Sequence, residues 1–213
     1  MGFCGDIEIR AENDKDFHEA EWCCMKAFYN VYMPGCEEHL LLHNLRDDSA
    51  YLPLFSRVAI YKGKIVGGIY FEKAYFTPKG GEEEEIISFG PLFAEPRYQK
   101  KGIGEKLVLS TLSLVKERGY KAIIITGVPS YYPRFGFKPC FDLGLTMNDG
   151  TAFPALMGLS LKDDYLEKCG GGSFRESDIM IKRKSHEEVE AFDALFPPLE
   201  KKTLPGQWKS PNP

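Results

Sequence analysis

Two glycines separated by one residue stand where an expected strand gives way to an expected helix. In residues 99–104 the sequence reads Gln-Lys-Lys-Gly-Ile-Gly. Glycine lets the backbone turn sharply and brings bare amide groups close to a ligand. The first turn of the following helix adds unpaired N–H donors and the positive end of the helix dipole. The spacing therefore predicts a turn that binds phosphate or pyrophosphate.

Neighbouring residue types separate three kinds of phosphate site. A Walker-type loop needs lysine and then Ser or Thr at its last glycine, but here Gly104 is followed by Glu105. A dinucleotide fingerprint needs a third glycine where this chain has Leu107. It also needs an acidic residue at the end of the next strand, which ends instead at Thr126. The residues therefore disfavour the first two kinds of site, and the third kind rests on the family resemblance that the surrounding blocks carry.

The elements around the turn form a strand–helix–strand unit. Residues 86–94 predict a buried strand, 105–118 an amphipathic helix that stops at Gly119, and 122–126 an apolar strand. Such a unit pairs its two strands in parallel under a right-handed crossover.

The rest of the chain predicts elements on both sides of this unit. Upstream we expect a strand at 7–10, a helix at 16–30 and a second helix at 36–46. A hairpin follows, with strands at 58–61 and 65–70. Gly67 and Gly68 in the hairpin indicate a bulge or a close backbone approach. Residues 78–85, with four consecutive glutamates, predict a solvated loop.

The C-terminal third predicts a short turn or helix at 131–137, then strands and loops over 141–181. Ser185 predicts the cap of a last helix that runs to Leu195. The Pro-rich residues 197–213 predict a tail or arm, and Trp208 in it is a candidate to dock on the body or on a second subunit. We divide the chain into one domain, 1–182, and an appendage, 183–213, of the same domain.

Ordered blocks within 86–137 together resemble one known family. The pattern Gln-x-x-Gly-x-Gly after a strand resembles the acyl-CoA-binding motif of the GNAT superfamily of N-acetyltransferases. The segments 96–99, 119–120 and 132–137 are similar to blocks of the same family, in the expected order. Residues 31–39 resemble a bacterial subgroup of uncharacterised predicted acetyltransferases. The resemblance implies an α+β (mixed α/β) fold, in which helices flank a mixed, mostly antiparallel sheet with a splayed parallel strand pair.

The resemblance also implies a cosubstrate and its contacts. Acetyl-CoA would lie in the gap between strands 86–94 and 122–126, with no metal involved. Backbone groups of Leu92, Phe93 and Ala94 would bond its pantetheine arm as an added strand does, and an amide there would polarise the thioester carbonyl. Its pyrophosphate would meet the backbone of six consecutive residues: Gln99, Lys100, Lys101, Gly102, Ile103 and Gly104. The side chains of Lys100 and Lys101 would add positive charge there, and the alternative is that both lysines are simply solvated.

Tyr132 matches the family position whose phenol often protonates the departing CoA thiolate. A phenol stays protonated at neutral pH and so can act as an acid. The alternative is that Tyr131 and Tyr132 form an aromatic pair packed over the cofactor arm. Glu38 and His39 are candidates for the base, and both also fit an ordinary helix surface, so the base stays unassigned.

Cys36, His39 and His43 would share one face of a helix and so raise the alternative of a metal site. No second ligand cluster accompanies them, and the leucines between them favour a helix packed against the core. We therefore predict no metal.

The sequence predicts transfer of an acetyl group from acetyl-CoA to a primary amine, by direct attack in a ternary complex. A small-molecule amine is favoured over a protein amine. The alternative is a non-catalytic acyl-CoA-binding sensor or regulatory module. The net charge of −4 gives no support for a nucleic-acid partner, and no apolar run is long enough to span a bilayer. We therefore expect a cytoplasmic protein without nucleic-acid or membrane partners. A homodimer is possible.

Overall fold

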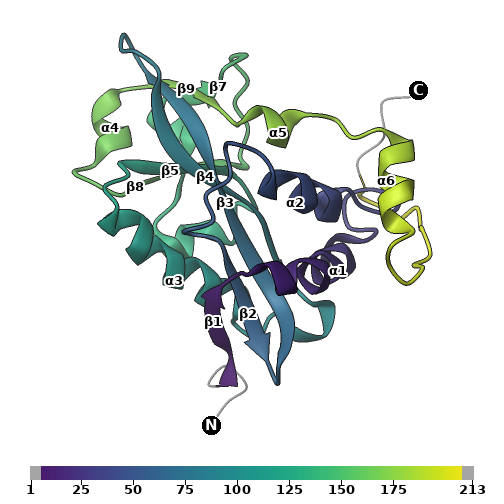
Figure 1. The fold of residues 1–213 in the computed structure, drawn as a ribbon. Helices are drawn as coiled ribbons and strands as arrows, with labels where there is room; N and C mark the ends of the chain where they lie inside the picture. The colour runs from purple at the N-terminus through teal and green to yellow at the C-terminus, as the bar shows by residue number, and fades with distance from the viewer. Residues whose placement is uncertain (1–5, 208–213) are drawn as a thin grey trace.

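The computed structural model describes residues 6–207, and its centre is a nine-stranded mixed sheet with helices against both faces (Figure 1). The strands are β1 (Glu8–Ala11), β2 (Arg57–Tyr61), β3 (Lys64–Pro78), β4 (Glu84–Ala94), β5 (Ala122–Thr126), β6 (Lys138–Pro139), β7 (Leu145–Met147), β8 (Leu156–Ser160) and β9 (Gly172–Arg175). The α-helices are α1 (Phe17–Phe28), α2 (Glu38–Arg46), α3 (Ile103–Glu117), α4 (Tyr165–Cys169), α5 (Asp178–Ile181) and α6 (His186–Asp193). Within residues 6–207, none of these helices is long and apolar enough to cross a membrane.

The strands follow the order β1-β2-β3-β4-β5-β8-β6, with β9 on the far end of β3 and β7 beside β9. Neighbours are antiparallel except in the pairs β4–β5 and β7–β9. β4 and β5 share one register position, Ile87 opposite Ile123. Beyond it the two strands continue to Ala94 and Thr126 without pairing, so they separate toward their C-terminal ends. The predicted fold class, including the splayed parallel pair, is confirmed.

Successive side chains of β3 enter two separate cores. Ile69 and Phe71 pack with α3, whereas Tyr70 between them packs with α1 and α2. The sheet therefore lies between α3 on one side and the α1–α2 pair on the other (Figure 1). This arrangement brings the end of α1, the end of β4 and the start of α3 together beside the gap between β4 and β5.

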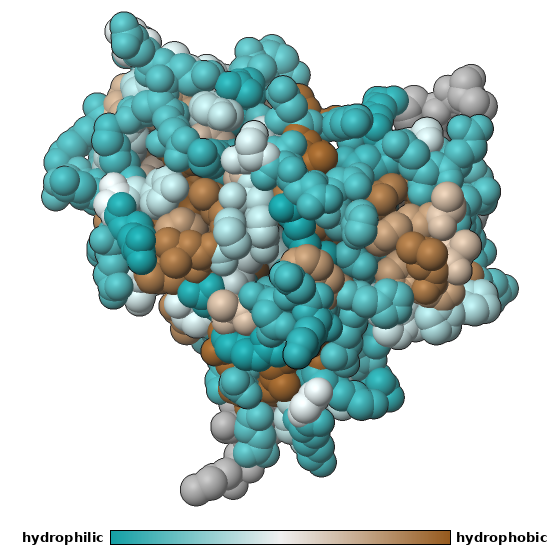
Figure 2. All heavy atoms as spheres, in the orientation of Figure 1, coloured by the Kyte–Doolittle hydropathy of each residue, from teal (hydrophilic) through white to brown (hydrophobic). Residues whose placement is uncertain are grey.

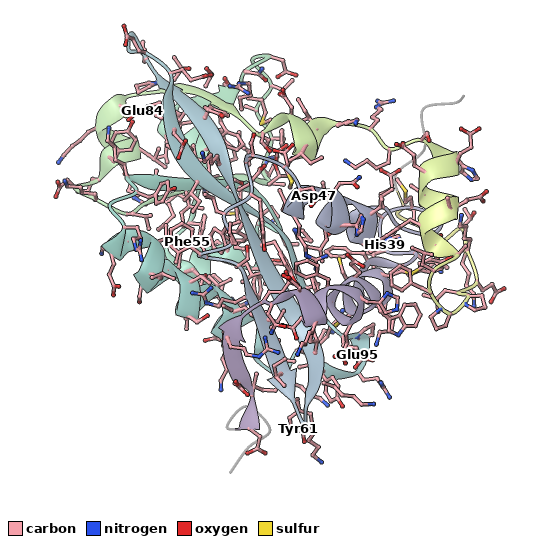
Figure 3. The ribbon with its side chains drawn as sticks, in the orientation of Figure 1. His39, Asp47, Phe55, Tyr61, Glu84 and Glu95 are labelled. Carbon is pink, nitrogen blue, oxygen red and sulfur yellow. The ribbon has the colours of Figure 1, made fainter. Side chains whose placement is uncertain are left out.

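β3 is much longer than the expected hairpin strand 65–70. Its far end pairs with β4 on one edge, to Phe76 opposite Glu84, and with β9 on the other edge, to Pro78 opposite Gly172. The solvated loop expected at 78–85 is therefore shorter, and that expectation was wrong for Pro78, which belongs to β3, and for Glu84 and Glu85, which belong to β4. The Glu84 carboxylate, labelled in Figure 3, accepts hydrogen bonds from Lys121 and Tyr165.

The C-terminal segment is fixed to the first two helices. α6 starts with a capping box at Ser185, as expected, and its apolar face packs on α1 and α2. The chain from 197 to 207 has no helix or strand, but Tyr29 and Asn30 donate hydrogen bonds to the carbonyls of Leu199 and Glu200. Figure 2 shows hydrophobic atoms at the surface beside α6. Leu195, which follows this helix, is exposed. Trp208 lies outside the described residues, and the boundary at 182/183 stays a prediction.

A buried carboxyl anchors the segment between β9 and α5. Glu72 on β3 is fully buried and accepts a hydrogen bond from the Ser177 hydroxyl, while its other oxygen has no partner among residues 6–207. Burial is the main cause that raises the pKa of Glu72 to about 8, and the nearby carboxylates of Glu176 and Asp48 add to the rise. Glu72 is therefore protonated at neutral pH and holds the start of α5 against the sheet.

We expect Glu72→Gln to flatten the pH dependence of stability. A carboxyl with a raised pKa in the folded chain contributes stability that is complete below its ordinary value of 4.5 and is lost as pH rises through about 8. Glutamine keeps an acceptor for Ser177 and never ionises. Thermal unfolding should show a melting temperature above wild type by several degrees at about pH 9 and a smaller difference at about pH 5.

The matched control is Glu85→Gln, because Glu85 is a half-exposed carboxylate on β4 that pairs with Lys73 at 3.8 Å. It should keep the wild-type profile. A Glu72→Gln profile as steep as wild type would contradict the assignment of the buried proton.

Candidate active site

Residues 99–104 form a sharp turn into α3. Lys100, with φ 57°, and Gly102, with φ 84°, adopt left-handed backbone conformations, and α3 begins directly afterwards at Ile103. No side chain caps this helix, so its first N–H groups are open to a ligand. Gln99 donates from Nε2 to the Ala94 carbonyl at 3.2 Å and so ties the turn to the end of β4. The geometry is that of an anion-binding helix start.

Gly67 lets α3 approach the sheet closely. A Cβ atom at this position would lie 2.8 Å from Ile103 Cγ2 and 2.7 Å from the Phe93 carbonyl oxygen, both too close. The pairing of β2 with β3 also shifts register nearby, between Ala59 and Ile60. A bulge or a close backbone approach was expected at Gly67 and Gly68, and the structure has the close approach at Gly67 with the register shift beside it. The close approach sets the start of α3 against the start of β3 and the end of β4.

The end of β4 presents free backbone groups to the gap beside β5. The amide of Glu95 donates to the Val66 carbonyl at 2.9 Å, so Glu95 and, by alternation, Phe93 face β3. The N–H and C=O groups of Leu92 and Ala94 therefore face the gap, and Ala94 already accepts from Gln99 there. The Phe93 ring is buried and stacks on Tyr70 at 6.0 Å between ring centroids.

Two neighbouring cavities follow this gap. One, of about 550 Å³, is lined by the turn, the end of β4, the end of α1 and the loop after β5: Ala27, Phe28, Val31, Tyr32, Leu92, Phe93, Ala94, Gln99, Lys100, Gly104, Val128, Ser130, Tyr131, Tyr132 and Arg134. The other, of about 540 Å³, adds α2 and the segment after β9: Phe28, Tyr32, Glu38, Leu41, Phe89, Gly90, Pro91, Leu92, Thr126, Gly127, Val128, Pro129, Tyr132, Ala155, Glu176 and Met180. We call them the phosphate-end cavity and the inner cavity. They share five residues and form one continuous slot.

Tyr132 lies at the junction, because it lines both cavities. It begins a short 3₁₀ turn, Tyr132–Phe135, and its ring packs against Phe89 and Phe137. Only 8% of the residue is exposed, and this burial raises the pKa of its phenol. The phenol is therefore protonated throughout the neutral range.

Gly127 makes room for this ring. A Cβ atom at Gly127 would lie 2.2 Å from Tyr132 Cε2 and 2.7 Å from Cδ2. Any larger residue at this position must displace the tyrosine. The neighbouring Tyr131 points elsewhere, since its hydroxyl would lie 2.7 Å from a Cβ atom at Gly104 in the phosphate-binding turn.

Two carboxylates line the inner cavity. Glu38 lies in the first turn of α2 and accepts from the Glu37 amide at 3.1 Å, and burial raises its pKa to about 7. Glu176 follows β9, and burial also raises its pKa, opposed by a hydrogen bond with the Thr126 side chain. The candidate base at Glu38 thus lies in the slot.

His39 points away from the slot. It is fully buried between α2 and α6, where Figure 3 labels it, with Nε2 2.8 Å from Asp193 Oδ1 and Nδ1 3.5 Å from Cys36 Sγ. His43 turns to Glu21 at 2.9 Å instead of joining them. Among residues 6–207, no group of three or more His, Cys, Asp or Glu side chains is arranged to hold a metal ion.

The sequence did not single out Arg134 or Glu176 as site residues. Arg134 lines the phosphate-end cavity, and its guanidinium lies 4.6 Å from the Tyr131 ring centroid. The sequence could have indicated Arg134, because it lies inside the block at 132–137 that resembles the family. Glu176 had none, because nothing near it in the sequence shows that it meets Thr126 across the slot.

A model of the Acetyltransferase (GNAT) family matches residues 15–137, more than half of the 213 residues. The chain therefore belongs to the GNAT family of acetyltransferases. It is 35% identical over 101 residues to the uncharacterised N-acetyltransferase YjhQ of Escherichia coli K12, covering 47% of this chain and 55% of that protein. It is 31% identical over 101 residues to the uncharacterised N-acetyltransferase YhbS of the same strain, covering 47% and 58%. The match spans little more than half the length of these relatives.

Two solved structures share the fold. One is the Escherichia coli GNAT family N-acetyltransferase YhbS in complex with CoA, with a TM-score of 0.71, 23% identity, and coverage of 84% of this chain and 94% of that one. The other is a GNAT family acetyltransferase from Brucella melitensis in complex with acetyl-CoA, with a TM-score of 0.64, 25% identity, and coverage of 82% and 97%. These likenesses agree with the GNAT-like fold expected from the sequence.

We expect Lys100→Ala and Arg134→Ala each to weaken CoA binding by about tenfold, the loss typical of one charge-assisted contact to phosphate. Both side chains line the phosphate-end cavity. Calorimetric titration with CoA measures the effect. Lys116→Ala, at the opposite end of α3, is the matched control and should bind like wild type. Equal affinities for all three variants would contradict the placement of the phosphates.

Proposed function

We propose that this chain transfers an acetyl group from acetyl-CoA to a primary amine, with a small molecule favoured over a protein. The observation that carries the proposal is the continuous slot. It joins an uncapped helix start to a pocket with two carboxylates, and a buried tyrosine lies at the junction. A phosphate-bearing donor fits one end and an amine the other.

The residues present fit acetyl-CoA. The open amides of the turn, with Lys100 and Arg134, suit the pyrophosphate. The backbone groups of Leu92 and the amide of Ala94, which face the gap, suit the amides of a pantetheine arm. Phe93 contributes the wall of the cavity, and Gln99, Lys101 and Ile103 contribute the turn itself. When bound, acetyl-CoA would supply the activated acetyl thioester.

Two side chains have the protonation states that the reaction needs. The attacking amine must lose a proton, and Glu38, with a pKa of about 7, is ionised often enough at neutral pH to take it directly or through water. The carbon–sulfur bond breaks as the carbon–nitrogen bond forms, and the departing thiolate needs a proton. The Tyr132 phenol, protonated because burial raises its pKa, can give that proton.

The test is release of free CoA thiol from acetyl-CoA across a panel of amines. Tyr132→Phe should lower kcat by about 100-fold, the usual contribution of a general acid, with little change in KM for acetyl-CoA. Gly127→Ala keeps the phenol but displaces its ring and should lower kcat similarly. Gly81→Ala, on an exposed turn with only ordinary contacts, is the control and should match wild type.

Three outcomes separate the alternatives. Turnover that depends on Tyr132 supports the proposal. Tight binding of acetyl-CoA without turnover on any amine favours the non-catalytic acyl-CoA sensor or regulatory module. Failure to bind acetyl-CoA at all would contradict both the transferase proposal and the acyl-CoA-binding module.

We expect kcat at saturating amine to rise with pH through about 7, because Glu38 accepts a proton only when ionised. Glu38→Gln should remove this inflection and lower kcat at about pH 8 by at least roughly tenfold. Glu187→Gln, at an exposed carboxylate at the start of α6, is the matched control and should keep the wild-type inflection. An unchanged pH profile in Glu38→Gln would assign the proton transfer to another group.

A further inference from the structure

The two ends of the slot carry opposite charge. The phosphate-end cavity contains Lys100 and Arg134, whereas the inner cavity contains Glu38 and Glu176. Among the described residues that line the inner cavity there is no Lys, Arg or His. Its other walls are mainly apolar: Phe28, Leu41, Phe89, Pro91, Leu92, Val128, Pro129, Ala155 and Met180. An acceptor held there meets apolar surface and negative charge.

This composition discriminates between acceptors by charge. An ammonium group that enters the cavity gains the attraction of two partly buried carboxylates, and partial burial strengthens that attraction relative to water. A carboxylate on the acceptor would be desolvated beside the same two groups with no cation to pair with it. Amines that also carry a carboxylate, such as free amino acids, are therefore poor occupants.

Glu176 is the fixed member of the carboxylate pair. It hydrogen-bonds with the side chain of Thr126, the last residue of β5. The next residue, Ser177, bonds to the buried Glu72, so the backbone on that side is anchored to β3. Glu38 lies instead on α2, across the cavity. Glu176 thus holds a carboxyl group at a set place, separate from the group that takes the amine proton, and the hydrogen bond from Thr126 favours its ionised form against the effect of burial, which raises its pKa.

We propose that the acceptor is an amine with an apolar body and no carboxylate, and that Glu176 is the residue that excludes carboxylates. This inference rests on the proposed acetyl transfer and names its substrate class. Shape comes from the aromatic and aliphatic walls, and charge selection comes from the anchored carboxylate.

The experiment compares 4-(aminomethyl)benzamide with 4-(aminomethyl)benzoate. These probes have the same size and the same aminomethyl group, and they differ only in a neutral or charged group far from the amine. The ratio of their kcat/KM values with acetyl-CoA measures the selection. We expect wild type to prefer the benzamide by about 100-fold, as expected when a binding site leaves a buried charge unpaired.

Glu176→Gln should reduce this preference to less than about tenfold, chiefly by improving kcat/KM for the benzoate. Glu176→Lys should favour the benzoate. Glu187→Gln, an exposed carboxylate at the start of α6, is the control and should keep the wild-type ratio. Unchanged CoA affinity in every variant verifies that the fold and the phosphate end are intact.

The outcomes separate this inference from the proposed function. Equal kcat/KM for the two probes, or a ratio that Glu176→Gln leaves unchanged, overturns the charge selection while acetyl transfer stands. If neither probe nor any other amine is acetylated, the proposed function fails. Calorimetric binding of the two probes to the CoA-loaded protein then still tests the selection, which equal affinities overturn and a benzamide preference lost in Glu176→Gln supports.

Discussion

The site depends on the brief contact between β4 and β5. The two strands pair in parallel only at Ile87 and Ile123, and each is held on its outer edge by an antiparallel neighbour, β3 or β8. Beyond that position β4 stays paired with β3 and β5 with β8, so the inner edges of β4 and β5 separate and the backbone groups of Leu92 and Ala94 face the gap without a strand partner. An exposed strand edge inside a protein is costly unless a ligand or solvent satisfies it. The slot is therefore a consequence of the sheet topology.

Small residues then bring the reactive groups to this gap. Gly67 allows α3 to start against the sheet, and Gly127 leaves space for the Tyr132 ring. Both work by omission of a Cβ atom and not by a left-handed backbone, since neither has a positive φ. The phosphate end and the tyrosine are thus positioned by close packing, which tolerates little change.

Local features were predictable from the sequence, and features that arise from long-range burial were not. The turn at 99–104 and the block at 132–137 are contiguous, so their spacing carries the information. The length of β3 depends on pairing with β9, nearly a hundred residues later in the chain. His39 is buried and Glu38 lines the slot because α6 covers one side of α2. The sequence of α2 alone is amphipathic and does not show which side α6 covers.

The parts of the site belong to different parts of the chain, and this bears on how far relatives inform the acceptor. The family match covers residues 15–137, which include the turn, Tyr132 and Glu38. Ala155, Glu176 and Met180 line the inner cavity from beyond that range. They are held there by β8, by β9 and by the buried hydrogen bond between Ser177 and Glu72. The phosphate-end cavity thus lies wholly within the family match, whereas the inner cavity, where we propose that the acceptor binds, is built in part from residues beyond it, so the relatives inform the first more than the second.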